Sequence, residues 1–132
     1  MPVINLYPIL AAAVASFVFG ALWYSPLLFR KRWCREVEIN PIQASATSFR
    51  VYTLTFSITL FTAFAFAHVM GPNPAPGLSI PLALLISVAF VSASMGINYQ
   101  FANRSLALWL IDCGFHVGRF LIMALVISYW PV

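Results

Sequence analysis

The sequence predicts an all-α, polytopic membrane protein with four transmembrane helices packed as two antiparallel pairs. Hydrophobic residues make up 62% of the 132 residues and charged residues only 8%, whereas soluble domains carry about 25% charged residues. Four apolar stretches, at about residues 3–29, 51–70, 78–102 and 106–130, are each long enough for a bilayer core that takes about 20 helical residues to cross. None alternates as a barrel strand would, so each is expected to be a helix. We treat residues 1–132 as one four-helix domain.

The first stretch is expected to be a retained helix rather than a signal peptide. It has no positive segment before it and ends in Arg30-Lys31-Arg32 without a small-residue cleavage site. Pro26 should end or kink this helix near the inner membrane surface.

The loop over residues 30–50 is expected to be cytoplasmic. Lys and Arg collect on the inner side of a membrane, and the basic residues around this loop are Arg30, Lys31, Arg32, Arg35 and Arg50. Both termini should therefore face outward. The loop is either a solvated charged segment or holds a short amphipathic piece that docks a partner. The net charge of +4 fits contact with anionic lipid and is no argument for nucleic acid.

The other helices follow with short connections. Residues 71–77 contain three prolines and two glycines and no charge, which predicts a tight turn between the second and third helices. Asn103-Arg104-Ser105 is so short that the third and fourth helices must pack antiparallel. The expected membrane is a bacterial inner membrane or an organellar membrane.

Aromatic residues near the end of the first helix are expected to lie at headgroup depth. Trp23, Tyr24 and Trp33 are amphipathic rings of the kind that anchor helices at the interface. His68, near the outer end of the second helix, is expected to have no role.

Small residues mark the surfaces on which helices approach in lipid. The expected packing residues are Ser16, Gly20, Gly96, Gly114 and Gly118. On the fourth helix the two glycines lie opposite a stripe of ionisable residues, so both sides of that helix need shelter. A lone four-helix bundle could provide this shelter, but a homo-oligomer or a larger membrane complex with the fourth helix near the interface provides it more easily, and we predict one of these assemblies.

The ionisable stripe of the fourth helix is the candidate site. Asp112, His116 and Arg119 fall within an arc of about 60° at about 100° per residue, and each charge at the bilayer centre costs about 2.5–3.5 kcal/mol. In a structural interpretation, Asp112 and Arg119 neutralise each other directly or through a neighbouring helix, and neutral His116 bridges them by hydrogen bonds. Because the two are too far apart for an easy direct pair, water or a polar side chain of the third helix would be needed, and the candidates are Asn98, Tyr99 and Gln100. In a functional interpretation, the stripe lines a wet path for a proton, an ion or a small solute.

Other kinds of site are not expected. Asp112 and His116 could offer two metal ligands but have no clear third, and no serine or threonine has an identifiable base and acid beside it. We expect no cofactor, no metal and no enzymatic activity. Cys34 and Cys113 should lie at different depths, which disfavours a disulfide.

The sequence also resembles a known family over nearly its whole length. The resemblance rests on Asn5-Leu6, the block Gly20-Ala21-Leu22-Trp23-Tyr24-Ser25-Pro26-Leu27-Leu28-Phe29, Trp33, Asn98-Tyr99, Arg104-Ser105 and Leu110-Ile111-Asp112-Cys113-Gly114-Phe115-His116. In these pieces the chain is similar to the bacterial membrane proteins grouped as domain of unknown function 1761. The resemblance implies a small four-helix membrane protein with no established activity.

The family pattern also differs from this sequence at three positions. It commonly has an amide at position 112 and a tyrosine at position 115, and it has no arginine at position 119. The resemblance therefore implies that Arg119 compensates Asp112 within this chain, and that His116 and Asn98 carry any shared role. It also weakens the interpretation of Trp23 and Tyr24 as lipid anchors.

Two functions are expected from these observations. The first is a small oligomeric pathway for an ion, a proton or a small solute, using Asp112, His116 and Asn98. The second is a non-catalytic accessory subunit that docks onto a larger membrane complex through its small-residue surfaces and its inner loop.

Overall fold

All regular structure in the described part of the chain is helical. The computed structural model describes residues 4–40 and 48–131, and its elements are α1 (Leu6–Trp23), α2 (Arg30–Val37), α4 (Phe49–Met70), α5 (Pro76–Leu84), the π-helical η1 (Leu85–Ser92), α6 (Ala93–Phe101) and α7 (Leu106–Ser128). The predicted start of the first helix at residue 3 and positions 41–47 of the predicted loop lie outside the described residues.

Four helices in the described ranges are long and apolar enough to cross a membrane. They are α1, α4, the continuous run Pro76–Phe101 formed by α5, η1 and α6, and α7. Asn5, Ser48 and Ser105 cap three of them, each with a side chain that accepts a hydrogen bond from a backbone N–H of the first turn. The predicted fold class, a multi-pass helical membrane protein, is confirmed.

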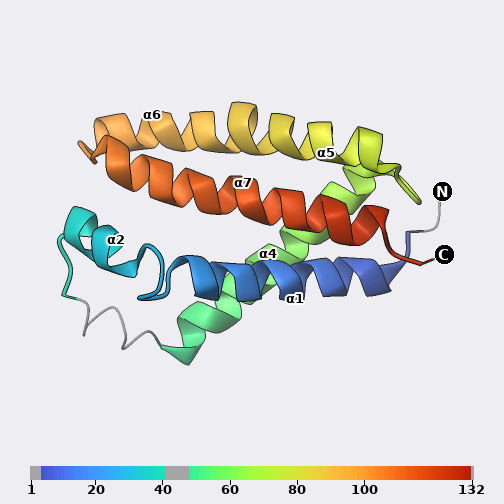
Figure 1. Cartoon of the computed structure of the whole chain (residues 1–132), viewed down its shortest axis with the longest axis horizontal. Coiled ribbons are helices and arrows are strands. Elements are labelled where there is room, and N and C mark those ends of the chain that lie inside the picture. The colour runs from blue at the N-terminus through green and yellow to red at the C-terminus, as the bar shows by residue number, and fades with distance from the viewer. Residues whose placement is uncertain (1–3, 41–47, 132) are drawn as a thin grey trace.

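Helix α7 occupies the centre of the bundle. It packs on α1 along one side and on α5 and η1 along the other, while α4 crosses behind α1 and meets α5 only near one end (Figure 1). The antiparallel pairs α1/α4 and α5–α6/α7 are thus joined through α1 and α7. The two termini lie at one end of the bundle, and α2 lies at the other, beside the turn from α6 to α7 (Figure 1).

The core fills the half of the bundle nearest the termini. Five alanines from four helices are fully buried there, and the rings of Phe66 and Phe120 meet edge to face with centroids 5.3 Å apart. The five alanines are Ala12, Ala13, Ala63, Ala83 and Ala124. Such small side chains let helix backbones approach closely, which is the main source of helix association in lipid.

The first helix is shorter than predicted. It ends at Trp23 rather than at residue 29, because Pro26 has no N–H to continue the ladder and the Ser25 hydroxyl donates to the Leu22 carbonyl at 2.6 Å. The chain then turns and re-enters a helix at Arg30. The expected break at Pro26 is therefore found, with the break falling on its N-terminal side.

The segment after this turn is a docked helix rather than a solvated loop. In α2, Cys34 is 2% exposed, whereas Lys31, Arg32 and Arg35 face outward. The helix packs on the start of α7. Of the two possibilities for this loop, the short amphipathic helix is the one observed. It docks on α7 of its own chain.

Candidate functional site

The Asp112 side chain is held by three hydrogen-bond donors from three different parts of the fold. The Tyr24 hydroxyl donates to Oδ1 at 2.6 Å, the Trp33 indole Nε1 donates to the same oxygen at 3.1 Å, and the Tyr99 hydroxyl donates to Oδ2. We call Tyr24, Trp33 and Tyr99 the Asp112 cage. All three donors are uncharged, so the polar contacts of this side chain are made without a cation beside it.

Each member of the cage is placed by its own element. Tyr24 is the C-cap of α1, Trp33 lies in the second turn of α2, and Tyr99 lies near the end of α6. The cage therefore ties the ends of α1, α2 and α6 to α7. Trp23 adds a further tie, because its indole donates to the Ile111 carbonyl at 2.9 Å.

The cage lies near one end of the bundle rather than at its middle. Asp112 is six residues beyond Leu106, the first residue of α7, or about 9 Å along the helix axis. At that depth the free-energy cost of placing a carboxylate in the membrane is lower than at the bilayer centre.

The second part of the predicted stripe forms a separate pair deeper in the bundle. Arg119 donates from Nε to Nδ1 of His116 at 3.0 Å, and its guanidinium carbon lies 5.0 Å from the centroid of the Phe120 ring. Because Nδ1 accepts this bond, the imidazole is neutral and carries its proton on Nε2. Arg119 lies 13 residues beyond Leu106, about 20 Å along the helix, and its side chain leans back toward the centre.

Arg119 does not neutralise Asp112. The Arg119 side chain is only 8% exposed, and it makes no ion pair with any carboxylate in residues 4–40 and 48–131. The two side chains therefore do not pair directly, because the three uncharged donors of the cage occupy the Asp112 oxygens. The stripe divides into a caged anion and a buried cation.

Asn98 does not join either group. Its side chain is exposed, while its neighbour Tyr99 points to Asp112. On a helix one residue rotates the side chain by about 100°, so only one of the two can face α7. Of the polar residues on the third helix, Tyr99 rather than Asn98 is therefore the partner of Asp112.

Trp23, Tyr24 and Trp33 point into the protein rather than serving as free interfacial anchors. The signal that could have identified them is their concentration around Pro26, where α1 ends, level with Asp112 across the bundle. The basic residues Lys31, Arg32 and Arg35 are exposed as predicted, and Arg30 is partly buried.

The predicted packing residues all lie at contacts within the chain. Added Cβ atoms would lie 2.9 Å from Phe115 at Gly20, 2.8 Å from Trp23 at Gly114 and 2.5 Å from Phe19 at Gly118. The remaining two residues contact α7 as well, since Ser16 donates to the Arg119 carbonyl at 3.4 Å and Gly96 lies under Trp109. Helix α7 is sheltered on both sides by its own chain, which is the arrangement of a lone four-helix bundle. Oligomerisation stays a prediction.

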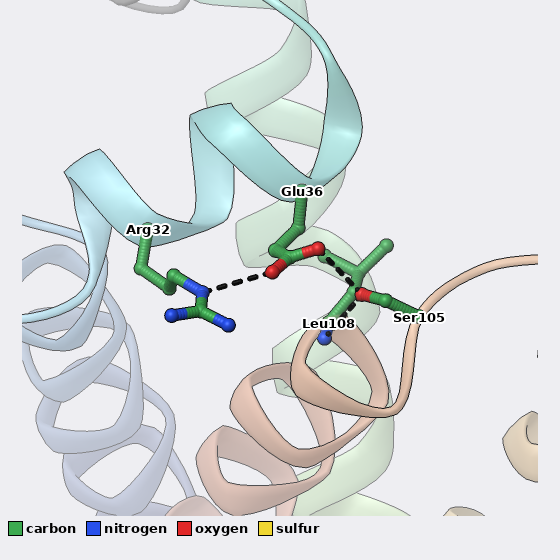
Figure 2. Close-up of polar contacts among 4 residues, drawn as sticks. All are labelled: Arg32, Glu36, Ser105 and Leu108. Carbon is green, nitrogen blue, oxygen red and sulfur yellow. Dashed lines mark hydrogen bonds and ion pairs between the residues drawn. The ribbon is translucent and has the colours of Figure 1, made fainter.

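A polar bridge holds α2 to the start of α7. The Glu36 carboxylate accepts from the Ser105 hydroxyl at 2.7 Å and from Arg32 Nε at 2.9 Å, and Ser105 accepts from the Leu108 N–H at 3.1 Å (Figure 2). The hydrogen bond from Ser105 contributes most to lowering the pKa of Glu36, and the hydrogen bond and positive charge of Arg32 lower it further. The carboxylate therefore helps to dock α2 while it is ionised.

We expect α2 to loosen as the pH falls below about 4.3, the ordinary pKa of glutamate. A carboxylate with a lowered pKa in the folded state adds stability that is fully present above its unfolded pKa and is lost as the pH falls through its folded pKa. The measurement is hydrogen exchange of the α2 amides in the wild type and in Glu36→Gln. The two proteins should differ at pH 6 and converge at low pH; equal protection at every pH would contradict the bridge.

Other reactive groups show no shared site. Cys34 and Cys113 are both buried and free. His68 bonds through Nδ1 to the Phe64 carbonyl of its own helix at 2.8 Å. Within the described ranges, no three His, Cys, Asp or Glu side chains gather as metal ligands would.

Comparison with known proteins gives a family but no relative of known activity. The model of a family described as "Protein of unknown function (DUF1761)" matches residues 7–128. No match was found among curated proteins or among solved structures. The matched range includes the Asp112 cage, the His116–Arg119 pair and all four apolar helices. The chain therefore belongs to the DUF1761 family of proteins of unknown function.

Proposed function

We propose that this protein provides a pathway for a small anionic solute across its membrane. The observation that carries the proposal is the buried Arg119 guanidinium, which has a neutral imidazole and aromatic rings as neighbours and no carboxylate partner in the described residues. An uncompensated cation at mid-span is costly. A passing anion would compensate it and would find an attractive position there.

The same arrangement disfavours protons and cations. Two like charges 4 Å apart repel by about 4 kcal/mol at the effective dielectric constant typical near a protein surface, and a fixed arginine is a known barrier to cations in pores. The Asp112 oxygens already accept bonds from the cage. A cation would have to displace these donors before it could bind the carboxylate.

The proposal is tested by flux into liposomes, with chloride, phosphate and acetate as probes. Arg119→Gln should reduce the anion flux about tenfold or more, the equivalent of one charged hydrogen bond. Arg119→Lys should keep part of it, and His116→Ala should lower it without unfolding the protein. Arg50→Gln, at an exposed basic residue at the start of α4, is the matched control. Equal flux in wild type and Arg119→Gln would overturn the proposal.

The alternative function, a non-catalytic accessory subunit, has lost part of its support. It relied on small-residue surfaces being free for a partner, and the aromatic rings of the chain's own α1 and α7 cover Gly20, Gly114 and Gly118. A folded protein that passes none of the three anions would restore this alternative.

We further propose that both termini face the non-cytoplasmic side and that the protein is not an enzyme. The orientation is supported by the basic residues Lys31, Arg32, Arg35 and Arg104, which are exposed at the end of the bundle opposite the termini (Figure 1). We call this end the inner end. A homo-oligomer in a bacterial inner membrane or an organellar membrane is part of the same proposal.

A further inference from the structure

A cavity of about 300 Å³ lies between α6 and α7 at the inner end of the bundle. It is separate from the His116–Arg119 pair, and its walls divide by chemistry. Arg104, Gln100 and Ser105 form a polar part, and Gly96, Ile97 and Trp109 contribute to an apolar part. An occupant that fills both parts must itself be amphipathic.

The polar part of the cavity is suited to an anion. No aspartate or glutamate lines it. The exposed Arg104 side chain makes no ion pair or hydrogen bond with the described residues. Glu36 bonds to Ser105 nearby, but its carboxylate is already paired with Arg32.

The backbone places Arg104 firmly at the cavity. Asn103 adopts the left-handed conformation with φ 56°, its N–H donates to the Gln100 carbonyl at 3.1 Å, and the Arg104 N–H donates to the Tyr99 carbonyl at 2.9 Å. This is the Schellman pattern that ends a helix. The turn fixes Arg104 where the membrane-spanning part of α6 has ended and headgroups begin.

The apolar part is shaped by Gly96, which has no side chain, and by the indole ring of Trp109, which a hydrogen bond holds in place. A Cβ at Gly96 would lie 3.3 Å from Nε1 of Trp109. That indole nitrogen donates to the Ser92 carbonyl at 3.0 Å. Glycine thus keeps a groove open along the ring, and the hydrogen bond holds the ring in place.

We propose that this cavity binds an anionic phospholipid of the inner leaflet. Arg104 and Gln100 contact its phosphate group, and the start of one acyl chain lies along Gly96, Ile97 and Trp109. Basic pockets between transmembrane helices on the cytoplasmic side are suited to such headgroups. A free phosphate would leave the apolar part empty. The bound lipid would also touch Tyr99, which lines the cavity and bonds to Asp112.

The test is native mass spectrometry of the delipidated full chain titrated with phosphatidylglycerol or phosphatidylcholine. We expect phosphatidylglycerol to bind about fivefold more tightly, because one basic group near a membrane surface contributes a factor of about that size. Arg104→Gln should remove most of this preference. Lys31→Gln, at an exposed basic residue on α2, is the control for loss of charge and should keep the preference.

A second pair of variants tests the acyl groove. Ala93→Leu should fill the cavity and weaken the binding of both lipids, whereas Ser94→Leu, at the next exposed residue outside the cavity lining, should not. The circular dichroism of each variant shows that it is folded. A preference that survives Arg104→Gln, or unchanged binding in Ala93→Leu, would overturn the proposal. So would inorganic phosphate that displaces the lipid at millimolar concentration. None of these outcomes depends on anion flux.

Discussion

Replacing Asp112 with alanine is expected to lower the free energy of unfolding by about 2–4 kcal/mol. The substitution removes the acceptor of Tyr24, Trp33 and Tyr99 together, and hydrogen bonds to a charged group contribute about 1.5–3 kcal/mol each when buried. The total stays below the sum because the site is only partly buried and water can reach some of the donors. Reversible unfolding in mixed detergent micelles, followed by far-ultraviolet circular dichroism, measures the difference.

Asp112→Asn is the matched variant, and we expect a loss of about 1 kcal/mol, the net value of one ordinary hydrogen bond. The amide oxygen can still accept from Tyr24 and Trp33, and the Tyr99 hydroxyl can rotate to accept from the amide nitrogen. An alanine variant as stable as the wild type would show that the cage does not hold the helices together. Equal losses for alanine and asparagine would show that charge, rather than the set of bonds, matters at this position.

Gly118→Leu should destabilise the protein by about 1–3 kcal/mol, the usual range for overpacking a filled interior. The added Cβ would lie 2.5 Å from the Phe19 ring, so the ring has to move and α1 has to shift from α7. The same unfolding measurement applies. The effect is on folding of the single chain, because the contact is internal.

A double variant identifies the cause. Phe19→Ala removes the ring that the new side chain meets, so Gly118→Leu should lower the free energy of unfolding much less in that background. The double variant should therefore lose less stability than the sum of the two single variants. Gly77→Leu is the control, since nothing lies within 4 Å of a Cβ at Gly77. If the two glycine variants lose equal stability, the packing of Phe19 on Gly118 is not the reason.

The membrane-spanning helices could be predicted from the sequence because they depend on local composition. Runs of about 20 apolar residues determine the spans, and Pro26 interrupts a helix wherever it is placed. The limits of the last span, 106–130 against the observed Leu106–Ser128, differ only at its frayed end.

The partners of the site could not be predicted in the same way. Asp112 was identified as a costly group from its type alone, but Tyr24 is 88 residues away and Trp33 79 residues away. Periodicity assigns a face to each side chain without saying which helix covers that face. The attraction of opposite charges favoured a pair between Asp112 and Arg119, and uncharged donors from distant segments took its place.

The docked helix α2 illustrates the same limit. Its basic residues predict a side of the membrane from the sequence alone, since charge acts over the whole loop. Its docking depends on the contacts of Glu36 with Ser105 and of Trp33 with Asp112, and on the burial of Cys34. Both need the three-dimensional position of α7.

The central place of α7 has a consequence for how the chain is made. Helices α1, α2, α5 and η1 all precede α7 in the chain, and all four pack on it. Until it is inserted, Phe19, Trp23 and Trp33 have no surface to bury and no acceptors for their indole groups. The bundle can therefore close only after α7 has been inserted, and a chain truncated before α7 would leave the pair α1/α4 without a helix that joins it to α5 and η1.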